Sequence, residues 1–149
     1  MAVSTFTLNG QLCFAAHSAS RALTAHYRRG LDEIGLTYTQ YVVMLVLWER
    51  GPVGMGTLCE ELHSDSGTLS PLLKRLEKQG LVTRRRGVED ERTLEIACTQ
   101  AGLDLYEPAR KVQAAVEDAT GLDGPELAAL REDLTLLASR LWASLDAAG

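Results

Sequence analysis

The 149-residue sequence predicts a mainly α-helical chain with one small β-hairpin. Apolar residues recur at three- to four-residue steps along most of the chain, which is the spacing of amphipathic helices. One polar turn, residues 63–66, separates two short helical segments. Beyond it, two segments with period-two alternation flank the polar loop 87–92, as in a hairpin. The expected order is four helices, the hairpin and two further helices.

The first helix is predicted over residues 12–34, with Asn9 as its N-cap and Gly35 as its end. Thr37 followed three residues later by Gln40 is a capping box, which predicts the start of a second helix. That helix is expected to run to about Arg50, before a Gly-Pro pair.

A helix-turn-helix is predicted next, from a short helix at 57–62, the turn 63–66 and a helix to about Gln79 that Gly80 ends. In such a motif the second helix can lie in the major groove of DNA. The segments 82–86 and 93–98 then form the hairpin. Together these elements predict a winged helix-turn-helix over residues 37–98.

Residues 99–149 are predicted to be helical, with a helix to about residue 119 and a break at 121–125. The last helix carries leucines close to a heptad spacing: Leu127, Leu130, Leu134, Leu137, Leu141 and Leu145. They could pack within their own chain, but we expect a homodimer seam. Residues 1–36 and 99–149 are therefore assigned to a dimerisation region, within a single-domain chain.

Composition excludes several classes of protein. The longest apolar stretch is far shorter than the roughly 20 residues that cross a membrane. Three irregularly spaced cysteines fit neither a disulfide framework nor a zinc site, so we expect a cytoplasmic protein without a metal or other cofactor. The net charge is −5, yet residues 66–100 hold seven basic and five acidic side chains, a local charge of +2. A basic surface of this kind can attract phosphates, although a solvated charged face is the commoner explanation.

The chain resembles the MarR family of winged helix-turn-helix regulators. The resemblance rests on the segment from Asp65 to Val82, DSGTLSPLLKRLEKQGLV, and on Glu89 to Thr93, which matches the Asp-x-Arg pattern of the family's wing. It covers nearly the whole chain. It implies a transcriptional repressor that binds double-stranded DNA as a homodimer, not an enzyme.

Within that family the chain is similar to the organic-hydroperoxide-sensing OhrR branch. Cys13 near the start of the first helix, Tyr27 fourteen residues later and Tyr38 match that branch. The resemblance implies that Cys13 is the peroxide-reactive thiol and that the two tyrosines hydrogen-bond it from the other subunit. No cysteine occurs in residues 99–149, where two-cysteine members have their resolving cysteine. The chain thus resembles the one-cysteine type, whose sulfenic acid is capped by a small cellular thiol or overoxidised.

Helix geometry agrees with a site shared between subunits. Fourteen residues advance a helix by about 21 Å, so Tyr27 cannot reach Cys13 along its own helix. The same fourteen steps bring Tyr27 to within about 40° of the Cys13 face. Two first helices that run antiparallel would therefore place each Cys13 near the partner's tyrosine.

Two neighbours of Cys13 are candidate members of a sensor pocket. The resemblance implies that Phe14 would favour bulky organic peroxides. His17 lies on the same helix face as Cys13, where relatives often have a tyrosine, and could assist thiolate formation or only fill space. Cys59 and Cys98 are expected to pack in the core.

The DNA-binding candidates lie on the second helix of the helix-turn-helix and on the hairpin. Short hydroxyls can approach bases and phosphates, and basic side chains can contact phosphates. Since neighbours on a strand point to opposite faces, Arg84, Arg85 and Arg86 cannot all face DNA, and Arg84 and Arg86 are expected to share one face. The resemblance adds a wing-tip arginine that enters the minor groove and an aspartate that holds it. The candidates are Ser66, Thr68, Ser70, Lys74, Arg75, Arg84, Arg86, Asp90 and Arg92.

The leading hypothesis is a cytoplasmic homodimeric repressor that releases a pseudo-palindromic operator when organic hydroperoxide oxidises Cys13. A second hypothesis is another MarR-type regulator, either a broader thiol redox regulator or one that binds an aromatic ligand reversibly. A third is a thiol peroxidase that uses Cys13. Without the resemblance, an isolated helical cysteine is most often a small buried apolar residue.

Overall fold

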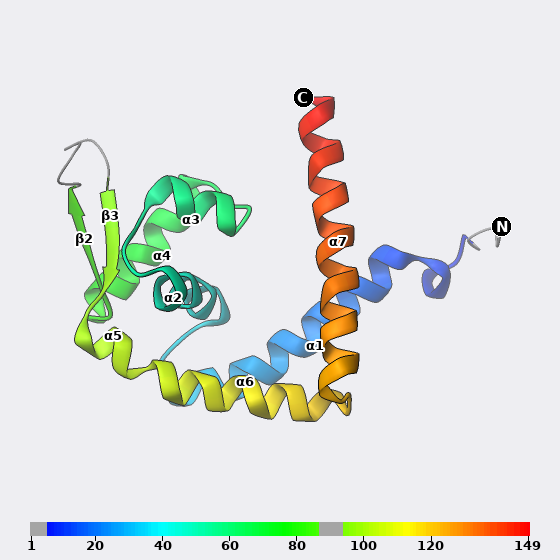
Figure 1. Cartoon of the computed structure of the whole chain (residues 1–149), viewed down its shortest axis with the longest axis horizontal. Coiled ribbons are helices and arrows are strands. Elements are labelled where there is room, and N and C mark those ends of the chain that lie inside the picture. The colour runs from blue at the N-terminus through cyan, green and yellow to red at the C-terminus, as the bar shows by residue number, and fades with distance from the viewer. Residues whose placement is uncertain (1–5, 87–93) are drawn as a thin grey trace. The chain divides into compact units, whose positions relative to one another are not determined.

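The computed structural model describes residues 6–86 and 94–149. The chain divides into two compact units, Met1–Gln113 and Ala114–Gly149. The first unit contains α1 (Leu12–Glu33), α2 (Tyr38–Arg50), α3 (Met55–Glu61), α4 (Ser66–Lys78), α5 (Gln100–Asp104) and the first half of α6 (Tyr106–Thr120). A small sheet completes it, and the second unit contains the end of α6 and α7 (Gly124–Ala148) (Figure 1).

The start of α1 differs from the prediction. Asn9 does not cap this helix, because residues Leu8–Gly10 form a separate 3₁₀ turn. Thr7 caps that turn by accepting a hydrogen bond from the Gly10 N–H at 3.2 Å. Gln11 is the N-cap of α1 and makes no side-chain capping bond. The predicted end is confirmed, since Gly35 adopts a left-handed conformation with φ of 75° just beyond the helix.

The α2 capping box is confirmed in both directions. The Gln40 N–H donates to Thr37 Oγ1 at 3.2 Å, and the Thr37 N–H donates to Gln40 Oε1 at 3.0 Å. The helix-turn-helix follows as α3 and α4, with Asp65 as the N-cap of α4. The prediction placed α4 correctly up to Gln79, its C-cap, and Gly80 has φ of 74°.

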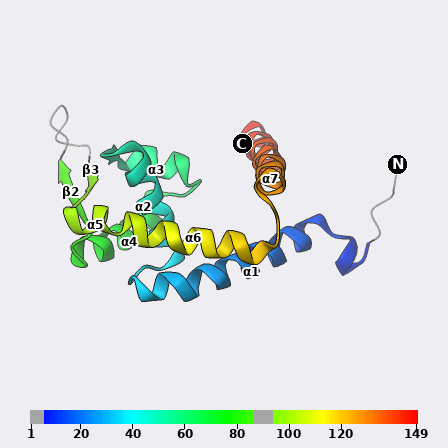
Figure 2. The ribbon, with the colours of Figure 1, turned by 60° about the horizontal axis from the view of Figure 1, so that its bottom comes forward.

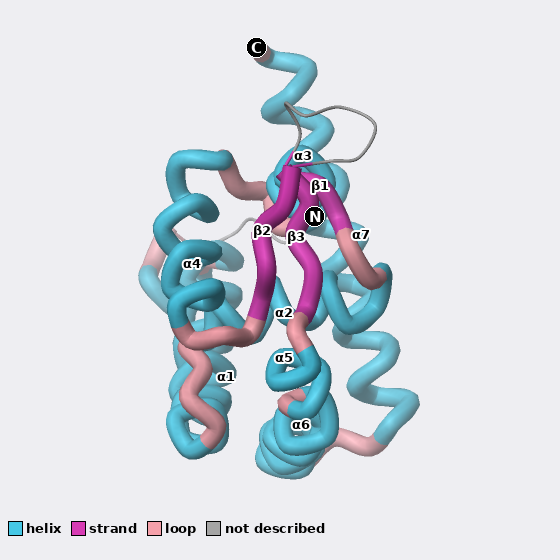
Figure 3. Tube along the Cα trace, turned by 90° about the vertical axis from the view of Figure 1, so that its left-hand side faces the viewer, coloured by secondary structure: helices cyan, strands magenta, loops and turns pink. Residues whose placement is uncertain are grey.

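The sheet has three antiparallel strands in the order β1-β3-β2 (Figure 3). The predicted hairpin is present as β2 (Val82–Arg86) and β3 (Leu94–Cys98), with Arg84 paired to Ile96. The sequence did not reveal β1 (Val53–Gly54), because two residues are too few to show alternation. Val53 pairs with Ile96 and joins the sheet to the start of the helix-turn-helix.

The segment predicted as one helix after residue 99 is two. α5 ends at Asp104, Leu105 is its C-cap, and α6 begins at Tyr106. Pro108 supplies the physical reason: it has no N–H to donate to the carbonyl of Asp104, and its ring crowds that carbonyl. The first part of α6 lies beside α1 (Figure 2), where a Cβ on Gly30 would come within 2.7 Å of Val112.

One apolar core holds the first unit together. Side chains from α1, α2, α3, α4 and β3 meet in it, and the fully buried members include Leu31, Val43, Met44, Leu47, Leu58, Leu73, Leu76 and Ile96. On α4 the core residues Leu69, Leu73 and Leu76 recur at three- to four-residue steps, which leaves the opposite face of this helix in solvent.

α7 begins with a second capping box, in which Asp123 and Glu126 bond each other's backbone N–H groups at 2.9 and 2.8 Å. Six of its large apolar side chains are exposed by 42% or more: Leu130, Leu134, Leu136, Leu141, Trp142 and Leu145. Four of the six leucines predicted for the dimer seam are among them, whereas Leu127 and Leu137 are half-buried. The dimer seam stays a prediction.

Candidate functional site

Cys13 is the second residue of α1 and its thiol is exposed. The start of a helix favours negative charge, by about 0.3–1 kcal/mol at an exposed position. Two large apolar neighbours are also open to solvent, since Leu12 is 66% and Phe14 40% exposed. His17, one turn later, is exposed as well. The first turns of α1 thus present an exposed thiol between exposed apolar side chains.

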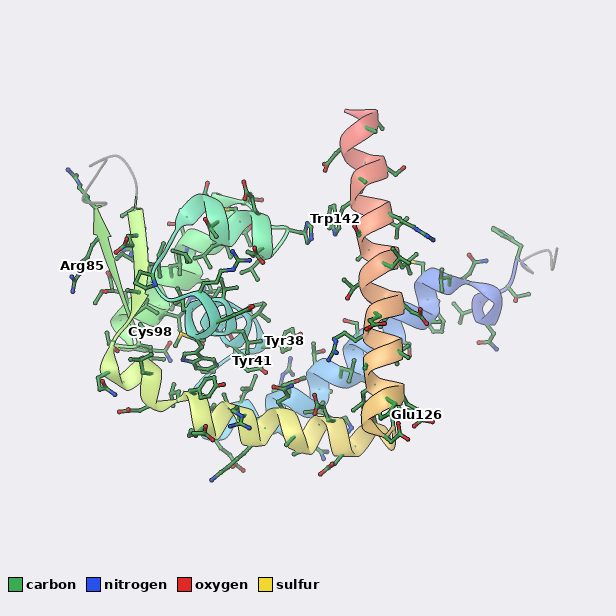
Figure 4. All side chains as sticks on the ribbon, in the orientation of Figure 1. Tyr38, Tyr41, Arg85, Cys98, Glu126 and Trp142 are labelled. Atoms are coloured by element: carbon green, nitrogen blue, oxygen red, sulfur yellow. The ribbon has the colours of Figure 1, made fainter. Side chains whose placement is uncertain are left out.

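Tyr27 and Tyr38 are brought together. Tyr27 lies in the second half of α1 and Tyr38 is the first residue of α2, and their ring centroids are 5.5 Å apart. Tyr41 joins them, 5.2 Å from Tyr27 and 6.1 Å from Tyr38. Figure 4 shows Tyr38 and Tyr41 next to each other on α2. The predicted pair is therefore part of a three-tyrosine cluster at the junction of α1 and α2.

Within one chain, Cys13 lies far from the tyrosine cluster. α1 is a single unbroken helix from Leu12 to Glu33, so fourteen residues separate Cys13 from Tyr27 by about 21 Å along its axis. The helix therefore carries the thiol at one end and the tyrosines toward the other. A site that contains both needs a second copy of the chain.

The tyrosine cluster continues into a longer aromatic row that sequence reasoning missed. Trp48 lies 6.5 Å from Tyr41, and Tyr106 lies 5.7 Å from Trp48 in an edge-to-face arrangement. The Arg110 guanidinium lies 6.0 Å from the Tyr106 ring centroid. A cavity of about 130 Å³ is lined by Tyr41, Leu45, Trp48, Tyr106, Ala109, Arg110 and Gln113. The seven-residue spacing of Tyr41 and Trp48 on α2 could have indicated a shared face, but nothing local indicates Tyr106.

The exposed face of α4 carries most of the DNA-binding candidates. Ser66 and Thr68 are exposed in its first turn, Ser70 is half-buried, and Lys74 and Arg75 are exposed one turn further. The turn before the helix is tied down by Asp65, whose Oδ1 accepts the Thr68 N–H at 2.7 Å. This hydrogen bond lowers the pKa of Asp65. A groove of about 520 Å³ between the starts of α3 and α4 and β3 is lined by Gly54, Met55, Gly56, Ser66, Gly67, Ser70 and Leu94.

The three arginines of β2 have different surroundings. The Arg84 guanidinium donates to Glu77 of α4 through Nε at 3.1 Å and Nη2 at 3.3 Å, and only 20% of its side chain is exposed. These bonds lower the pKa of Glu77. Arg85 and Arg86 are exposed, and Arg85 projects away from the helices (Figure 4). Arg84 therefore braces the wing against α4, and Arg85 is a cation that the sequence reasoning left out. Asp90 and Arg92 lie outside the described residues.

The other two cysteines pack against the edge of the core, rather than within it as predicted from the sequence. Cys59 of α3 and Cys98 of β3 are both half-buried. Burial raises the pKa of the Cys98 thiol, which lowers its thiolate fraction at neutral pH. Over residues 6–86 and 94–149, no three metal-ligating side chains gather at one point, and no helix has the length and apolar character to cross a membrane.

Comparison with known proteins identifies the family. The MarR family model matches residues 36–94. The chain is 40% identical over 134 residues to the organic hydroperoxide resistance transcriptional regulator of Bacillus subtilis strain 168, covering 90% of this chain and 91% of that protein. It is 41% identical over 128 residues to the HTH-type transcriptional regulator SarZ of Staphylococcus saprophyticus, covering 86% of this chain and 88% of that one.

A solved structure of reduced AbfR bound to DNA matches with a TM-score of 0.74 and 34% identity, over 90% of this chain and 94% of that chain. Its winged helix-turn-helix architecture is the one described above. These relatives are regulators of transcription rather than enzymes. The chain belongs to the MarR family of transcriptional regulators.

Proposed function

We propose that this protein is a cytoplasmic homodimeric repressor that binds a pseudo-palindromic operator and releases it when an organic hydroperoxide oxidises Cys13. One observation carries the proposal: α1 presents an exposed Cys13 at its start and a tyrosine cluster about 21 Å further along. In an antiparallel pair of α1 helices, each thiol would meet the partner's Tyr27 and Tyr38. The similarity to a regulator of organic hydroperoxide resistance supports the same reading.

The chemistry requires a thiolate. Its sulfur attacks one peroxide oxygen, the S–O bond forms, the O–O bond breaks, and the alkoxide leaves and takes up a proton. The sulfur is thereby oxidised by two electrons to a sulfenic acid. Two phenol O–H groups and the start of α1 would stabilise the thiolate before the attack, since hydrogen bonds to an anion are strong. Leu12, Phe14 and the other exposed apolar groups near the thiol suit a bulky organic peroxide.

The sulfenic acid has no partner cysteine in the C-terminal helices. We infer that a small cellular thiol caps it, forming a mixed disulfide and releasing water, or that further peroxide overoxidises it. His17 lies one turn from Cys13, where it can take part in proton transfer at the sulfur or pack beside it.

DNA binding would use the exposed face of α4 and the wing. Ser66, Thr68 and Ser70 at the start of α4 would approach bases and phosphates, and Lys74 and Arg75 would contact phosphates. On the wing, Arg86 is exposed, whereas Arg84 would need to leave Glu77 to reach DNA. Asp90 and Arg92 are proposed for the minor groove from the resemblance alone. A twofold dimer implies half-sites about one helical turn apart.

The test uses an operator selected from random double-stranded DNA by the reduced wild-type protein. Wild type, Cys13→Ser and Cys98→Ser are compared by gel retardation with and without cumene hydroperoxide. We expect wild type and Cys98→Ser to release the DNA, and Cys13→Ser to retain it. Equal release by Cys13→Ser would show that Cys13 is not the sensor.

Mixed dimers test the shared site. One chain carries Cys13→Ser, and its partner carries Tyr27→Phe and Tyr38→Phe. If thiol and tyrosines come from different chains, this dimer retains one complete site, and that thiol reacts at the wild-type rate. If they came from the same chain, no complete site would remain and the slow rate of the tyrosine variant would be seen.

A second candidate is a regulator that binds an aromatic ligand reversibly. The small cavity between Tyr41, Trp48 and Tyr106, with Arg110 at its side, favours it, because these groups suit a planar acid. Loss of operator binding with salicylate, unaffected by Cys13→Ser, would support this candidate against the oxidation mechanism.

A further inference from the structure

Two glutamines join the α1–α2 turn to the end of α4. Gln40 is 94% buried, and its Nε2 donates to Gln79 Oε1 at 2.9 Å. Gln79 Nε2 donates in turn to the Gly35 carbonyl at 3.0 Å. Gln40 Oε1 accepts the Thr37 N–H at 3.0 Å, so the chain of hydrogen bonds returns to the same turn. We refer to Gln40 and Gln79 as the glutamine clamp.

The clamp connects the tyrosine cluster to the helix expected to read DNA. Tyr38, whose ring packs on Tyr27, lies two residues before Gln40 in the first turn of α2. Gln79 is the C-cap of α4, and its N–H donates to the Arg75 carbonyl at 2.9 Å. The path from Tyr38 to the last turn of α4 therefore passes through one short, directional set of bonds.

Directionality distinguishes this contact from the apolar packing around it. Apolar side chains can slide against each other with little loss, whereas a hydrogen bond weakens steeply when its angle departs from linear. A buried amide must also keep its partner, because an unpaired one is costly in an apolar environment. A displacement of Gln40 thus requires Gln79 to follow.

One side of the end of α4 faces solvent beside the clamp. A cleft of about 590 Å³ lies beside the clamp, lined by Asp32, Gly35, Leu36, Thr37, Gln40, Arg75, Lys78 and Gln79. Arg75, Lys78 and Gln79 on its α4 side are exposed. The hydrogen bond between Gln40 and Gln79 connects the two sides of this cleft.

We propose that the glutamine clamp is the link through which the position of Tyr38 sets the position of the C-terminal end of α4. Gln40 and Gln79 act as positioning residues, which transmit a change in the tyrosine cluster to the helix expected to read DNA. The regulatory part of this inference rests on the proposed function. The mechanical part concerns only α2 and α4.

The main test compares Gln79→Ala with wild type and with Gln100→Ala, a control that removes a Gln100–Asp104 hydrogen bond on the surface of α5. Gln79 is exposed, so its variant is expected to fold. The readout is the ratio of operator dissociation constants of the peroxide-treated and reduced proteins. We expect Gln79→Ala to lower this ratio at least about fivefold, the lower limit of typical coupling between sites. In Gln79→Ala the rate of Cys13 oxidation should stay at the wild-type value. In Gln100→Ala the ratio of operator dissociation constants should also stay at the wild-type value.

A merely structural role would lower the melting temperature and leave the ratio unchanged. An unchanged ratio, with a wild type that responds to peroxide, overturns the clamp and leaves the proposed function standing. Gln79→Glu supplies a graded variant, because its carboxylate can accept from Gln40 but cannot donate to Gly35.

A second measurement needs neither DNA nor peroxide. Hydrogen exchange over residues 75–81 is compared in wild type, Tyr38→Ala, Gln79→Ala and the double variant. We expect Tyr38→Ala to accelerate exchange there in the wild-type background and to add nothing once Gln79 is gone, which is the non-additivity of coupled residues. The clamp is overturned if the effects of Tyr38→Ala and Gln79→Ala on exchange simply add. It is also overturned if Tyr38→Ala leaves exchange over residues 75–81 unchanged. A wild type that keeps its operator in peroxide overturns the proposed function, and this second measurement then decides the clamp by itself.

Discussion

Gly102 is the position where adding one carbon should be most costly. It lies in α5 against the base of the wing, and its carbonyl accepts the Trp48 indole N–H at 3.0 Å. A Cβ at this position would lie 2.2 Å from the Leu81 carbonyl oxygen and 3.2 Å from Met44 Cε. The Leu81 oxygen cannot easily turn away, because it accepts the Thr99 N–H at 3.0 Å.

Two opposing contributions determine how much Gly102→Ala changes the free energy of unfolding. In an open helix, replacing glycine by alanine stabilises by about 1 kcal/mol. Overpacking typically costs about 1–3 kcal/mol, and a clash this severe with a backbone atom belongs at the upper end. We therefore expect a net loss of about 2 kcal/mol, or roughly 4–8 °C in Tm for a chain of this size.

The assay is urea unfolding at one fixed protein concentration, followed by circular dichroism and tryptophan fluorescence. Fixed concentration matters because the proposed dimerisation would stabilise the fold by mass action. Gly56→Ala is the matched control, since a Cβ on Gly56 of α3 has no neighbour within 4 Å and should cost nothing. If Gly102→Ala were as stable as wild type, the close approach of α5 to the wing base would be wrong.

Three further predictions concern the same unit. Leu73→Ala on α4 removes a fully buried side chain and should lower the free energy of unfolding by about 2–5 kcal/mol, measured by the same urea titration. Cys98, whose burial raises its pKa, should react with iodoacetamide at pH 8 more slowly in the folded than in the urea-unfolded protein; equal rates by mass spectrometry would contradict this. The pKa values of Asp65 and Glu77 are lowered by folding, so their stabilisation is complete above their usual pKa values and lost as pH falls through the lowered ones. The stability difference between wild type and Asp65→Asn should therefore shrink below about pH 4.

The sequence alone predicted the features that depend on near neighbours. The Thr37–Gln40 capping box, the glycine ends at Gly35 and Gly80, and the hairpin all follow from hydrogen bonds or side-chain alternation over a few residues. The residues proposed for the sensor site, Cys13, Tyr27 and Tyr38, stay a prediction that rests on their match to a known branch. These predictions rest on short stretches of sequence or on similarity to a known family, so they required no knowledge of the packing.

Only the tertiary structure decided which distant residues meet. It pairs Val53 with Ile96, engages Arg84 with Glu77, extends the tyrosine cluster to Tyr106, and gives Gln40 a second role beyond its capping box. These contacts follow from the way α2, α4 and the sheet close around one core. A side chain's partner across such a core depends on the summed packing of many residues, and no short stretch of sequence contains that sum.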